Sequence, residues 1–376
     1  MNTNLPSPCY ICEEELLEKN LRLLKKVQDE ADINILLALK GFAMFSTFDM
    51  CKKYLKGCCA SGLNEAILAS KEFGLEVHTY SPAFKPNEFE QITQISHHIV
   101  FNSFTQLDTY KSKVKPSNSL GLRVNPEYSS VEVDLYNPCG TYSRLGITKK
   151  EFVKNFSNFN LIDGLHFHAL CEQNVDALQG ALANFEKNFS EYFDKLSWVN
   201  FGGGHHITRD DYDIDGLIRT LKEFKKRYPH LKVYLEPGEA VGWKTGYLEA
   251  TVLDIVHNGI DIAILDTSAE CHMPDTLAMP YKAEIRGASS DPKEKKYSYR
   301  LGGNTCLAGD IIGDYSFDTP LKIGDKIILE DMIHYTMVKT TTFNGINLPS
   351  VAIKREDGNF DVIRDYDYES YKDRLS

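Results

Sequence analysis

The sequence contains no run of basic residues long enough to follow a nucleic-acid backbone. Its 376 residues carry a formal net charge of −11 and have a pI near 5.5. The short basic clusters, such as the one at 222–227, fit the exposed face of a helix. This balance argues against nucleic acid as a partner. It suits cationic small molecules, although a protein can also be acidic for solubility alone.

The sequence also lacks metal-ligand spacing among its cysteines and any long apolar run. The nine cysteines are scattered, and the CxxC pattern from Cys9 to Cys12 has no second pair that would complete a zinc site. We therefore expect reduced, buried thiols and a cytoplasmic protein. No segment is long and apolar enough to span a membrane, and the amino-terminal residues show no signal-peptide pattern, so no membrane partner is expected.

What the sequence does contain is a long alternation of short apolar runs and amphipathic helices. Eight runs are predicted as strands, and they lie at 33–43, 57–61, 76–80, 97–102, 119–125, 162–168, 198–201 and 232–236. Strands that alternate with helices in this way are typical of an α/β protein with a (β/α)8 TIM barrel. A doubly wound open sheet is the alternative, because periodicity by itself does not prove closure.

The pattern changes after residue 245. Strands now follow one another with few helices between them, at 247–257, 260–266, 297–301, 325–330 and 335–343. This arrangement is typical of an antiparallel β domain. We therefore predict a barrel over residues 13–245 and a carboxyl-terminal antiparallel β domain over residues 246–376, joined by a strand within residues 1–12.

Polar residues and glycines gather at the carboxyl ends of the predicted barrel strands. In a parallel barrel these ends meet on one face, where barrel enzymes carry their chemistry. The residues at these ends are Lys40, Ser61, His78, Asn125, His168, Gly202, Gly203, Gly204 and Glu236. The sequence therefore predicts a single site at this face.

Two of these features have a clear chemical use. Lys40 can form a Schiff base if its surroundings lower its pKa, although many strands simply end at a solvated lysine. The consecutive glycines Gly202, Gly203 and Gly204 let backbone N–H groups approach a phosphate, although they also suit a tight turn.

Glu236 and the histidines at 166 and 168 each have more than one possible role. Glu236 can pair with a protonated ring nitrogen, or it can cap a helix or form a salt bridge. His168 can stack on an aromatic cofactor. It can also share a metal ion with His166, as in metal-dependent barrel hydrolases, because alternate residues of a strand share a face.

Together these features match the needs of one cofactor. Pyridoxal 5'-phosphate requires a lysine, a phosphate cradle, an acid for its ring nitrogen and a side chain that stacks on its ring.

The motifs that carry these residues resemble those of the fold-type III, alanine-racemase-like pyridoxal-phosphate enzymes. The likeness is to the decarboxylase branch, which includes the ornithine and diaminopimelate decarboxylases, and within it to the carboxynorspermidine/carboxyspermidine decarboxylases. The motifs, in chain order, are LALKGFA (Lys40), CASGLNE (Ser61), YSRLG (Arg144), GLHFHALCEQN (His168), NFGGGHHI (Gly202 to Gly204), EPGEA (Glu236 to Glu239), CHMPD (Asp275), GNTCLAGD (Cys306 and Asp310) and MIHYTMVK (Tyr335).

This resemblance implies a role for each residue. Lys40, His168 and Cys306 are expected to be catalytic, and the Cys306 loop is expected to complete the site of a second subunit in a head-to-tail homodimer. A buried, unreactive thiol is the alternative for Cys306. Alanine racemases place an arginine opposite the ring nitrogen, so Glu236 argues for decarboxylation. The residues expected to bind the cofactor are Lys40, Ser61, His168, Gly202, Gly203, Gly204, Glu236, Gly238 and Tyr335.

One departure from the family pattern bears on the substrate. Ornithine-decarboxylase relatives have arginine after the EPG motif, where this chain has Glu239. Glu239 and Asp275 suit a small amino-acid substrate with ammonium groups at its far end, such as carboxyspermidine or carboxynorspermidine. Arg144 and Asp310 complete the predicted substrate-binding set. The alternative for Asp275 is a helix cap.

The predicted reaction is decarboxylation of carboxyspermidine or carboxynorspermidine to spermidine or norspermidine, within polyamine biosynthesis, with no metal required. Ornithine and diaminopimelate are the alternative substrates, and diaminopimelate fits less well because its distal carboxylate would meet Glu239 and Asp275. A non-catalytic pyridoxal-phosphate protein and a metal-dependent barrel hydrolase are more remote alternatives. The choice between two substrates that differ by one methylene stays open.

Overall fold

The chain divides into two compact units. The computed structural model describes residues 5–278 and 280–376, without the side chains at 156–158. One unit is residues 20–241, and the other combines the chain before residue 20 with the chain after residue 241. The predicted boundaries lie at 12/13 and 245/246, where the observed divisions fall at 19/20 and 241/242. Residues 1–4 of the predicted joining segment lie outside the described residues.

The first unit is a closed barrel. Its eight parallel strands within the described residues are β2 (Asn34–Ala38), β3 (Gly57–Ala60), β4 (Glu76–Tyr80), β5 (His98–Phe101), β6 (Ser119–Arg123), β7 (Gly164–His166), β8 (Trp198–Asn200) and β9 (Lys232–Leu235). β9 returns to β2, with Asn34 paired to Tyr234. The predicted (β/α)8 barrel is therefore confirmed, and the open-sheet alternative is wrong.

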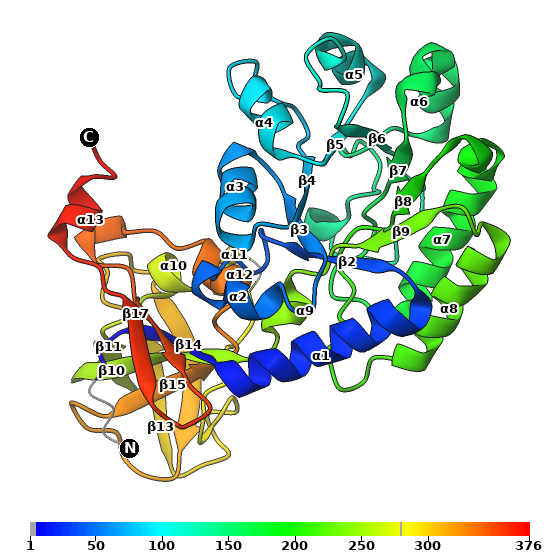
Figure 1. Ribbon diagram of the computed structural model, residues 1–376. Coiled ribbons are helices and arrows are strands. Elements are labelled where there is room, and N and C mark those ends of the chain that lie inside the picture. Colours follow the sequence, from blue (N-terminus) through cyan, green and yellow to red (C-terminus); the bar gives the residue numbers. More distant parts are fainter. Residues whose placement is uncertain (1–4, 279) are drawn as a thin grey trace. The chain divides into compact units, whose positions relative to one another are not determined.

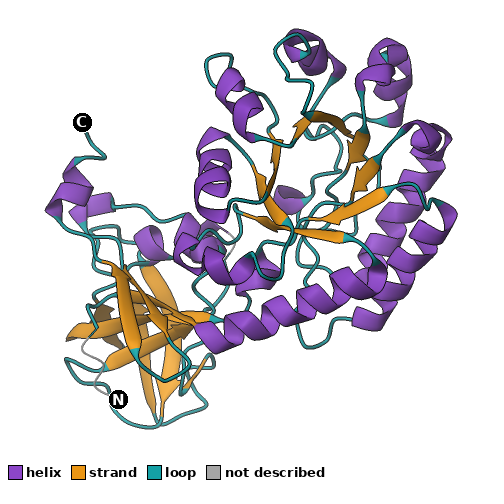
Figure 2. Cartoon of the chain, viewed as in Figure 1, coloured by secondary structure: helices purple, strands orange, loops and turns teal. Residues whose placement is uncertain are grey.

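Helices surround the ring of strands, as Figures 1 and 2 show. They are α1 (Glu14–Ala31), α2 (Phe48–Cys51), α3 (Leu63–Leu68), α4 (Phe89–Ile95), α5 (Phe104–Tyr110), α6 (Lys149–Lys154), α7 (Val175–Phe189), α8 (Ile214–Arg227) and α9 (Glu239–Gly242). Helix α8 shows why they form. Asp213 caps it by accepting a hydrogen bond from the Gly216 N–H at 2.8 Å, and Leu217, Leu221 and Phe224 are buried on one face.

The large Trp198 side chain fits inside the barrel because β6 and β7 each have a glycine at the position that faces it. A Cβ on Gly164 would lie 2.0 Å from the Trp198 ring, and a Cβ on Gly121 would lie 2.3 Å from it. The indole Nε1 donates to Ser119 Oγ at 2.8 Å, so its polar atom is satisfied. The indole therefore occupies the interior space that Gly121 and Gly164 leave, and Leu36, Val100 and Tyr234 pack in one cluster with it.

The second unit is a mixed sheet. Its nine strands in the described chain are β1 (Cys9–Glu13), β10 (Gly246–His257), β11 (Asp261–Leu265), β12 (Ala288–Ser289), β13 (Tyr297–Gly302), β14 (Ile311–Phe317), β15 (Lys326–Glu330), β16 (Ser350–Lys354) and β17 (Phe360–Arg364). Their order is β12-β14-β13-β11-β10-β1-β16-β17, with β15 also paired to β10. Most pairs are antiparallel, as predicted, but β1 with β16 and β11 with β13 are parallel.

Short helices follow the sheet strands of this unit. They are α10 (Ala269–His272), α11 (Asp275–Ala278), α12 (Tyr335–Val338) and α13 (Tyr368–Lys372). The predicted strand at 335–343 is wrong, because its first four residues form α12. Threonine, valine and tyrosine favour a strand only where a neighbouring strand pairs with them. Here the Met337 N–H bonds to the His334 carbonyl at 3.0 Å instead. Among the described helices, none has the combined length and apolar character needed to cross a membrane.

Candidate active site

Lys40 lies in the turn after β2, two residues beyond the last strand residue and not within the strand as predicted. The next residue, Gly41, lets this turn approach the loop after β9. A Cβ on Gly41 would lie 2.8 Å from the Glu239 nitrogen and 2.9 Å from the Gly238 Cα. The turn is thus held at the seam where the barrel closes.

Lys40 is exposed as a residue, while its ammonium group is surrounded by protein. Its pKa is lowered, chiefly because the surrounding protein displaces water from the ammonium. Cys59 and Glu236 oppose this effect, while Arg123 adds to it. A lysine with a lowered pKa is the form that attacks an aldehyde.

Glu236 follows β9, and two side chains flank its carboxylate. Asn200 Nδ2 donates to Oε1 at 2.7 Å, and His166 Nε2 lies 3.3 Å from Oε2. Burial opposes ionisation of Glu236, but His166, His78 and Asn200 outweigh it and lower the pKa to about 2. Burial also lowers the pKa of His166, so the pair consists of an ionised acid and a neutral imidazole.

Asn200 is a site residue that the sequence prediction missed. It is the last residue of β8 and is completely buried. Its Oδ1 accepts from the Gly202 N–H at 2.8 Å while its Nδ2 holds Glu236. One amide therefore ties the glycine turn to the acid. The available signal is its place at the inward-facing end of a barrel strand, two residues before the first glycine.

His168 lies beyond β7, and the glycine turn fixes its ring. The Gly203 N–H donates to Nδ1 at 2.9 Å, which leaves the ring proton on Nε2. Arg123 donates to the His168 carbonyl at 3.3 Å. Burial is the main reason why the pKa of His168 is well below its usual value. A neutral, oriented imidazole is suited to stacking on an aromatic ring.

The glycines at 202–204 are required by close packing on both sides. Gly202 and Gly204 have φ angles of +71° and +83°, and a Cβ on Gly203 would lie 2.2 Å from the Glu236 carbonyl oxygen. No other residue fits these positions. The N–H groups of Gly202 and Gly203 are already bound to Asn200 and His168, which the sequence prediction of a phosphate cradle did not include.

Arg123, at the end of β6, is a second missed residue. It is buried, and its guanidinium lies 4.7 Å from the centre of the Tyr80 ring. Tyr80 in turn donates to Asn102 at 2.8 Å, and the Asn102 amide donates to the Arg144 carbonyl at 2.8 Å. This chain of contacts connects the buried arginine to the loop that carries the exposed, predicted substrate residue Arg144.

Two further strand-end residues contact their own loops. Ser61 is exposed, and its backbone N–H donates to Glu65 Oε2 at 2.6 Å at the start of α3. Asn125 accepts from the Glu127 N–H at 2.8 Å. Gly238 is buried, and a Cβ on it would lie 2.7 Å from the Ala38 carbonyl oxygen. The absence of a side chain therefore lets the loop after β9 approach the end of β2.

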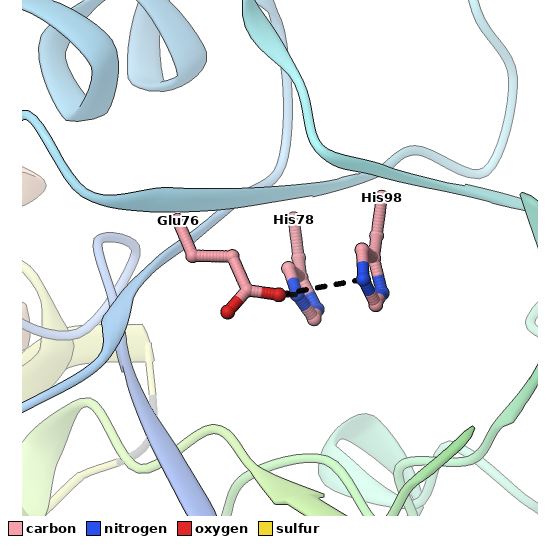
Figure 3. Close-up of side chains that lie close together, drawn as sticks. All are labelled: Glu76, His78 and His98. Atoms are coloured by element: carbon pink, nitrogen blue, oxygen red, sulfur yellow. Dashed lines mark hydrogen bonds and ion pairs between the residues drawn. The ribbon is translucent and has the colours of Figure 1, made fainter. Parts of the chain in front are cut away.

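His78 lies in the middle of β4 and not at the carboxyl end, as predicted. With Glu76 and His98 it forms a second polar group inside the barrel (Figure 3). His78 Nε2 lies 2.9 Å and His98 Nε2 3.3 Å from the same Glu76 oxygen. The two rings stack with an interplanar angle of 14°, and both Nε2 atoms face the same Glu76 oxygen. Neutral rings can each donate a hydrogen bond to it, and the three groups are also close enough together to hold a metal ion.

In the sheet unit, Asp310 is buried and accepts hydrogen bonds from its own neighbours. Its Oδ1 accepts from the Ala269 N–H at 2.7 Å, and its Oδ2 accepts from the Ser268 and Thr305 hydroxyls at 2.9 and 2.6 Å. These contacts join the start of α10 to the Cys306 loop. They favour a structural role over the predicted contact with substrate, because a ligand would have to displace them.

Cys306 is exposed, so the alternative of a buried thiol is wrong. Its backbone N–H donates to Asn344 Oδ1 at 2.7 Å. Tyr335 begins α12 in the same unit, and Asp275 begins α11. The Asp275 carboxylate is paired with Lys339. Glu239, the other predicted tail-binding acid, begins α9 and is partly buried.

Comparison with known proteins identifies the family of the chain. The sequence family described as "Pyridoxal-dependent decarboxylase, C-terminal sheet domain" matches residues 9–333. The carboxynorspermidine/carboxyspermidine decarboxylase of Campylobacter jejuni is 51% identical, with 98% of each chain covered. The carboxyaminopropylagmatine decarboxylase of Synechocystis is 47% identical, over 99% of this chain and 96% of that one.

Solved structures agree in fold. The carboxynorspermidine decarboxylase of Campylobacter jejuni, complexed with norspermidine, superposes with a TM-score of 0.92 at 49% identity, covering 98% of this chain and 100% of that one. A diaminopimelate decarboxylase from Helicobacter pylori has a TM-score of 0.81 at 18% identity, covering 98% and 96%, which is a likeness of fold alone. Fold, family match and full-length relatives agree, and the chain belongs to the pyridoxal-dependent decarboxylases.

Proposed function

We propose that this chain uses pyridoxal 5'-phosphate to decarboxylate carboxyspermidine and carboxynorspermidine, as a cytoplasmic homodimer with shared active sites. The observation that carries the proposal is geometric: Lys40 and the ionised Glu236 follow β2 and β9, the two paired strands that close the barrel, and the pKa of Lys40 is lowered there. Two relatives at about half identity are named for substrates of this kind. The solved relative holds norspermidine, the decarboxylated form of one such substrate.

The residues of the barrel fit a pyridoxal group. Lys40 offers its amine to the aldehyde. Glu236 has one oxygen bound to Asn200, while the other lies 3.3 Å from His166 Nε2. That second oxygen can accept the proton of a pyridinium nitrogen. When bound, the cofactor supplies an electron sink for the pair left on Cα as CO2 departs.

The chain's own residues then have separate tasks. Glu236 keeps the ring nitrogen protonated, because its pKa of about 2 leaves it ionised throughout the physiological range. His168 presents a neutral ring whose orientation is set by Gly203. Because the first two glycine N–H groups are occupied, we expect the phosphate to contact the N–H of Gly204, with Ser61, Gly238 and Tyr335 as further candidates.

Cys306 is the proposed donor of the proton to Cα. Its thiol is exposed on a loop anchored by Asp310 through Thr305 and by Asn344. An exposed loop thiol has no evident packing role in its own unit, which supports a task at the site of a second subunit. Measuring activity in mixed dimers of Lys40→Ala and Cys306→Ala chains tests this, because shared sites predict partial recovery from two inactive parents.

The substrate is the part of the proposal that needs a direct test. CO2 release from carboxyspermidine, carboxynorspermidine, ornithine and diaminopimelate should be compared on one preparation of the holoenzyme. Carboxyaminopropylagmatine belongs in the panel as a second candidate, because a 47% identical relative is named for it. The first two substrates are expected to have the highest kcat/KM. Faster turnover of ornithine or diaminopimelate would overturn the substrate assignment.

A further inference from the structure

Asp275, the acid proposed to bind the far end of the substrate, already holds a cation of the protein itself. Lys339 Nζ lies 2.5 Å from Asp275 Oδ1. The same ammonium lies 5.3 Å from the centre of the Tyr335 ring. Helices α11 and α12 lie close together in Figure 1, and this ion pair joins the start of α11 to the end of α12. The carboxylate is therefore neutralised from within its own unit.

The acid is the fixed member of the pair. Helix α10, which leads into α11, is capped by Ser268, whose hydroxyl accepts a backbone N–H at 3.1 Å. Asp310 holds the same turn from the opposite side, with a backbone N–H at 2.7 Å. In α11 itself, the Thr276 hydroxyl donates to a backbone carbonyl at 2.7 Å. The Asp275 side chain is only 15% exposed, so its position is set by this bonded platform.

The lysine is the movable member. Its side chain is 45% exposed, and it extends from the residue after α12 on a flexible four-carbon stem. Two interactions hold its ammonium, the Asp275 carboxylate and the Tyr335 ring, and both are of the modest strength that partly exposed charges give. The ammonium can therefore leave for solvent while the carboxylate stays in place.

We propose that Lys339 is an internal competitor for Asp275, which the distal ammonium of a substrate has to displace. The proposal rests on the proposed function, in which Asp275 binds that ammonium. Exchange of one ammonium for another keeps the acid paired. A substrate with a shorter or uncharged tail leaves the Lys339–Asp275 pair closed and gains nothing from it. The pair then lowers the apparent affinity for every cationic tail by the fraction of time that the acid is occupied.

If Lys339 competes for Asp275, removing its charge should strengthen the binding of cationic ligands. In Lys339→Met the apolar stem is kept and the competitor is lost, so spermidine and norspermidine should bind the holoenzyme about tenfold more tightly by titration calorimetry, about 1.4 kcal/mol. KM for carboxynorspermidine should fall with kcat little changed. Lys339→Arg keeps a cation on the acid and should restore the weaker binding. Lys293→Met, an exposed lysine in the same unit, serves as the control and should change neither quantity.

Asp275→Asn tests tail recognition by Asp275 separately from the competition by Lys339. It should weaken binding of spermidine, and in its presence Lys339→Met should have no further effect, because the residue to be competed for is gone. If Asp275→Asn weakens binding but Lys339→Met does not strengthen it, the competition is refuted while tail recognition stands. If Asp275→Asn has no effect on binding, tail recognition by Asp275 fails, and the competition fails with it.

Discussion

Two carboxylates inside the barrel have the same pKa and different surroundings. Glu76 and Glu236 are both lowered to about 2 against the cost of burial, and each has histidine neighbours. One Glu76 oxygen takes two histidines and the Tyr234 hydroxyl. Glu236 has one oxygen on Asn200 and the other 3.3 Å from His166 Nε2. A low pKa therefore shows that each acid is ionised but does not tell the two apart. Their places do: Glu76 is the first residue of β4, while Glu236 follows β9 at the carboxyl end of the barrel, where barrel enzymes carry their chemistry.

The different roles of Glu76 and Glu236 are tested most directly by neutralising each acid in turn. Glu236→Gln should reduce kcat/KM by about 100-fold or more, because the charge that holds the ring proton is lost. Glu76→Gln should change kcat/KM by only a few-fold, since its donors serve packing. Both are checked by CO2 release at saturating cofactor. A larger loss in Glu76→Gln than in Glu236→Gln would reverse the assignment of roles.

The amide that holds Glu236 gives the next largest effect. Asn200→Ala removes the hydrogen bonds to Glu236 and to the Gly202 N–H, and it should weaken cofactor binding about tenfold, as expected for a bond to a charged group. Equilibrium dialysis with absorbance detection measures this. Asn118→Ala is the matched control. Asn118 is also a buried amide, and it donates to the Thr93 and Ser96 carbonyls, so its loss should lower stability and leave cofactor affinity unchanged.

Low pH should protonate Glu76 and Glu236 over the same range. The pH dependence of stability therefore does not distinguish the acid that binds the cofactor from the other. Each folded pKa of about 2 lies below the ordinary value of 4.5. Their contribution to stability is therefore complete above pH 4.5 and is lost as the pH falls from 4.5 toward 2. Denaturant unfolding at several pH values should show a shallower decline in this window for Glu76→Gln and for Glu236→Gln. An unchanged slope in either variant would contradict its lowered pKa.

The smallest effect is expected at Ser61. Ser61 is exposed, and its hydrogen bond to Glu65 is donated by the backbone N–H. Substitution of the side chain leaves that bond in place. Ser61→Ala should therefore weaken cofactor binding by no more than about twofold to threefold, less than a charge-assisted bond is worth. A loss as large as that of Asn200→Ala would place the hydroxyl directly on the phosphate.

The barrel was predictable from sequence because each of its strands carries a local signal. Runs such as 76–80 are short, contain residues that favour strands and are flanked by helix patterns, and this run coincides with the observed strand. The sheet unit was harder. Strands β12, β14, β16 and β17 were not predicted, and 335–343 was misassigned. Their state depends on partners far apart in sequence, such as β1 beside β16, and no local pattern encodes such a pairing.

The site was predictable in its residue types and less so in its contacts. Lys40, His168 and Glu236 follow strands β2, β7 and β9, as a barrel requires. The sequence could not show that Asn200 joins Glu236 to the glycine turn, because that contact crosses two strands. Nor could it show that Asp310 is enclosed by donors of its own unit, since burial of a loop aspartate depends on the folded chain around it.

The indole of Trp198 has a consequence for how this barrel can change over evolutionary time. Its space is taken from Gly164 on the adjoining strand β7 and from Gly121 on β6, the strand beyond it, so a methyl group at either glycine collides with the ring unless the ring has first become smaller. Substitutions at the three positions are therefore conditional on one another, and their order matters. A path to a differently filled interior has to begin at the tryptophan, through a variant with a cavity, and only then can the glycines acquire side chains.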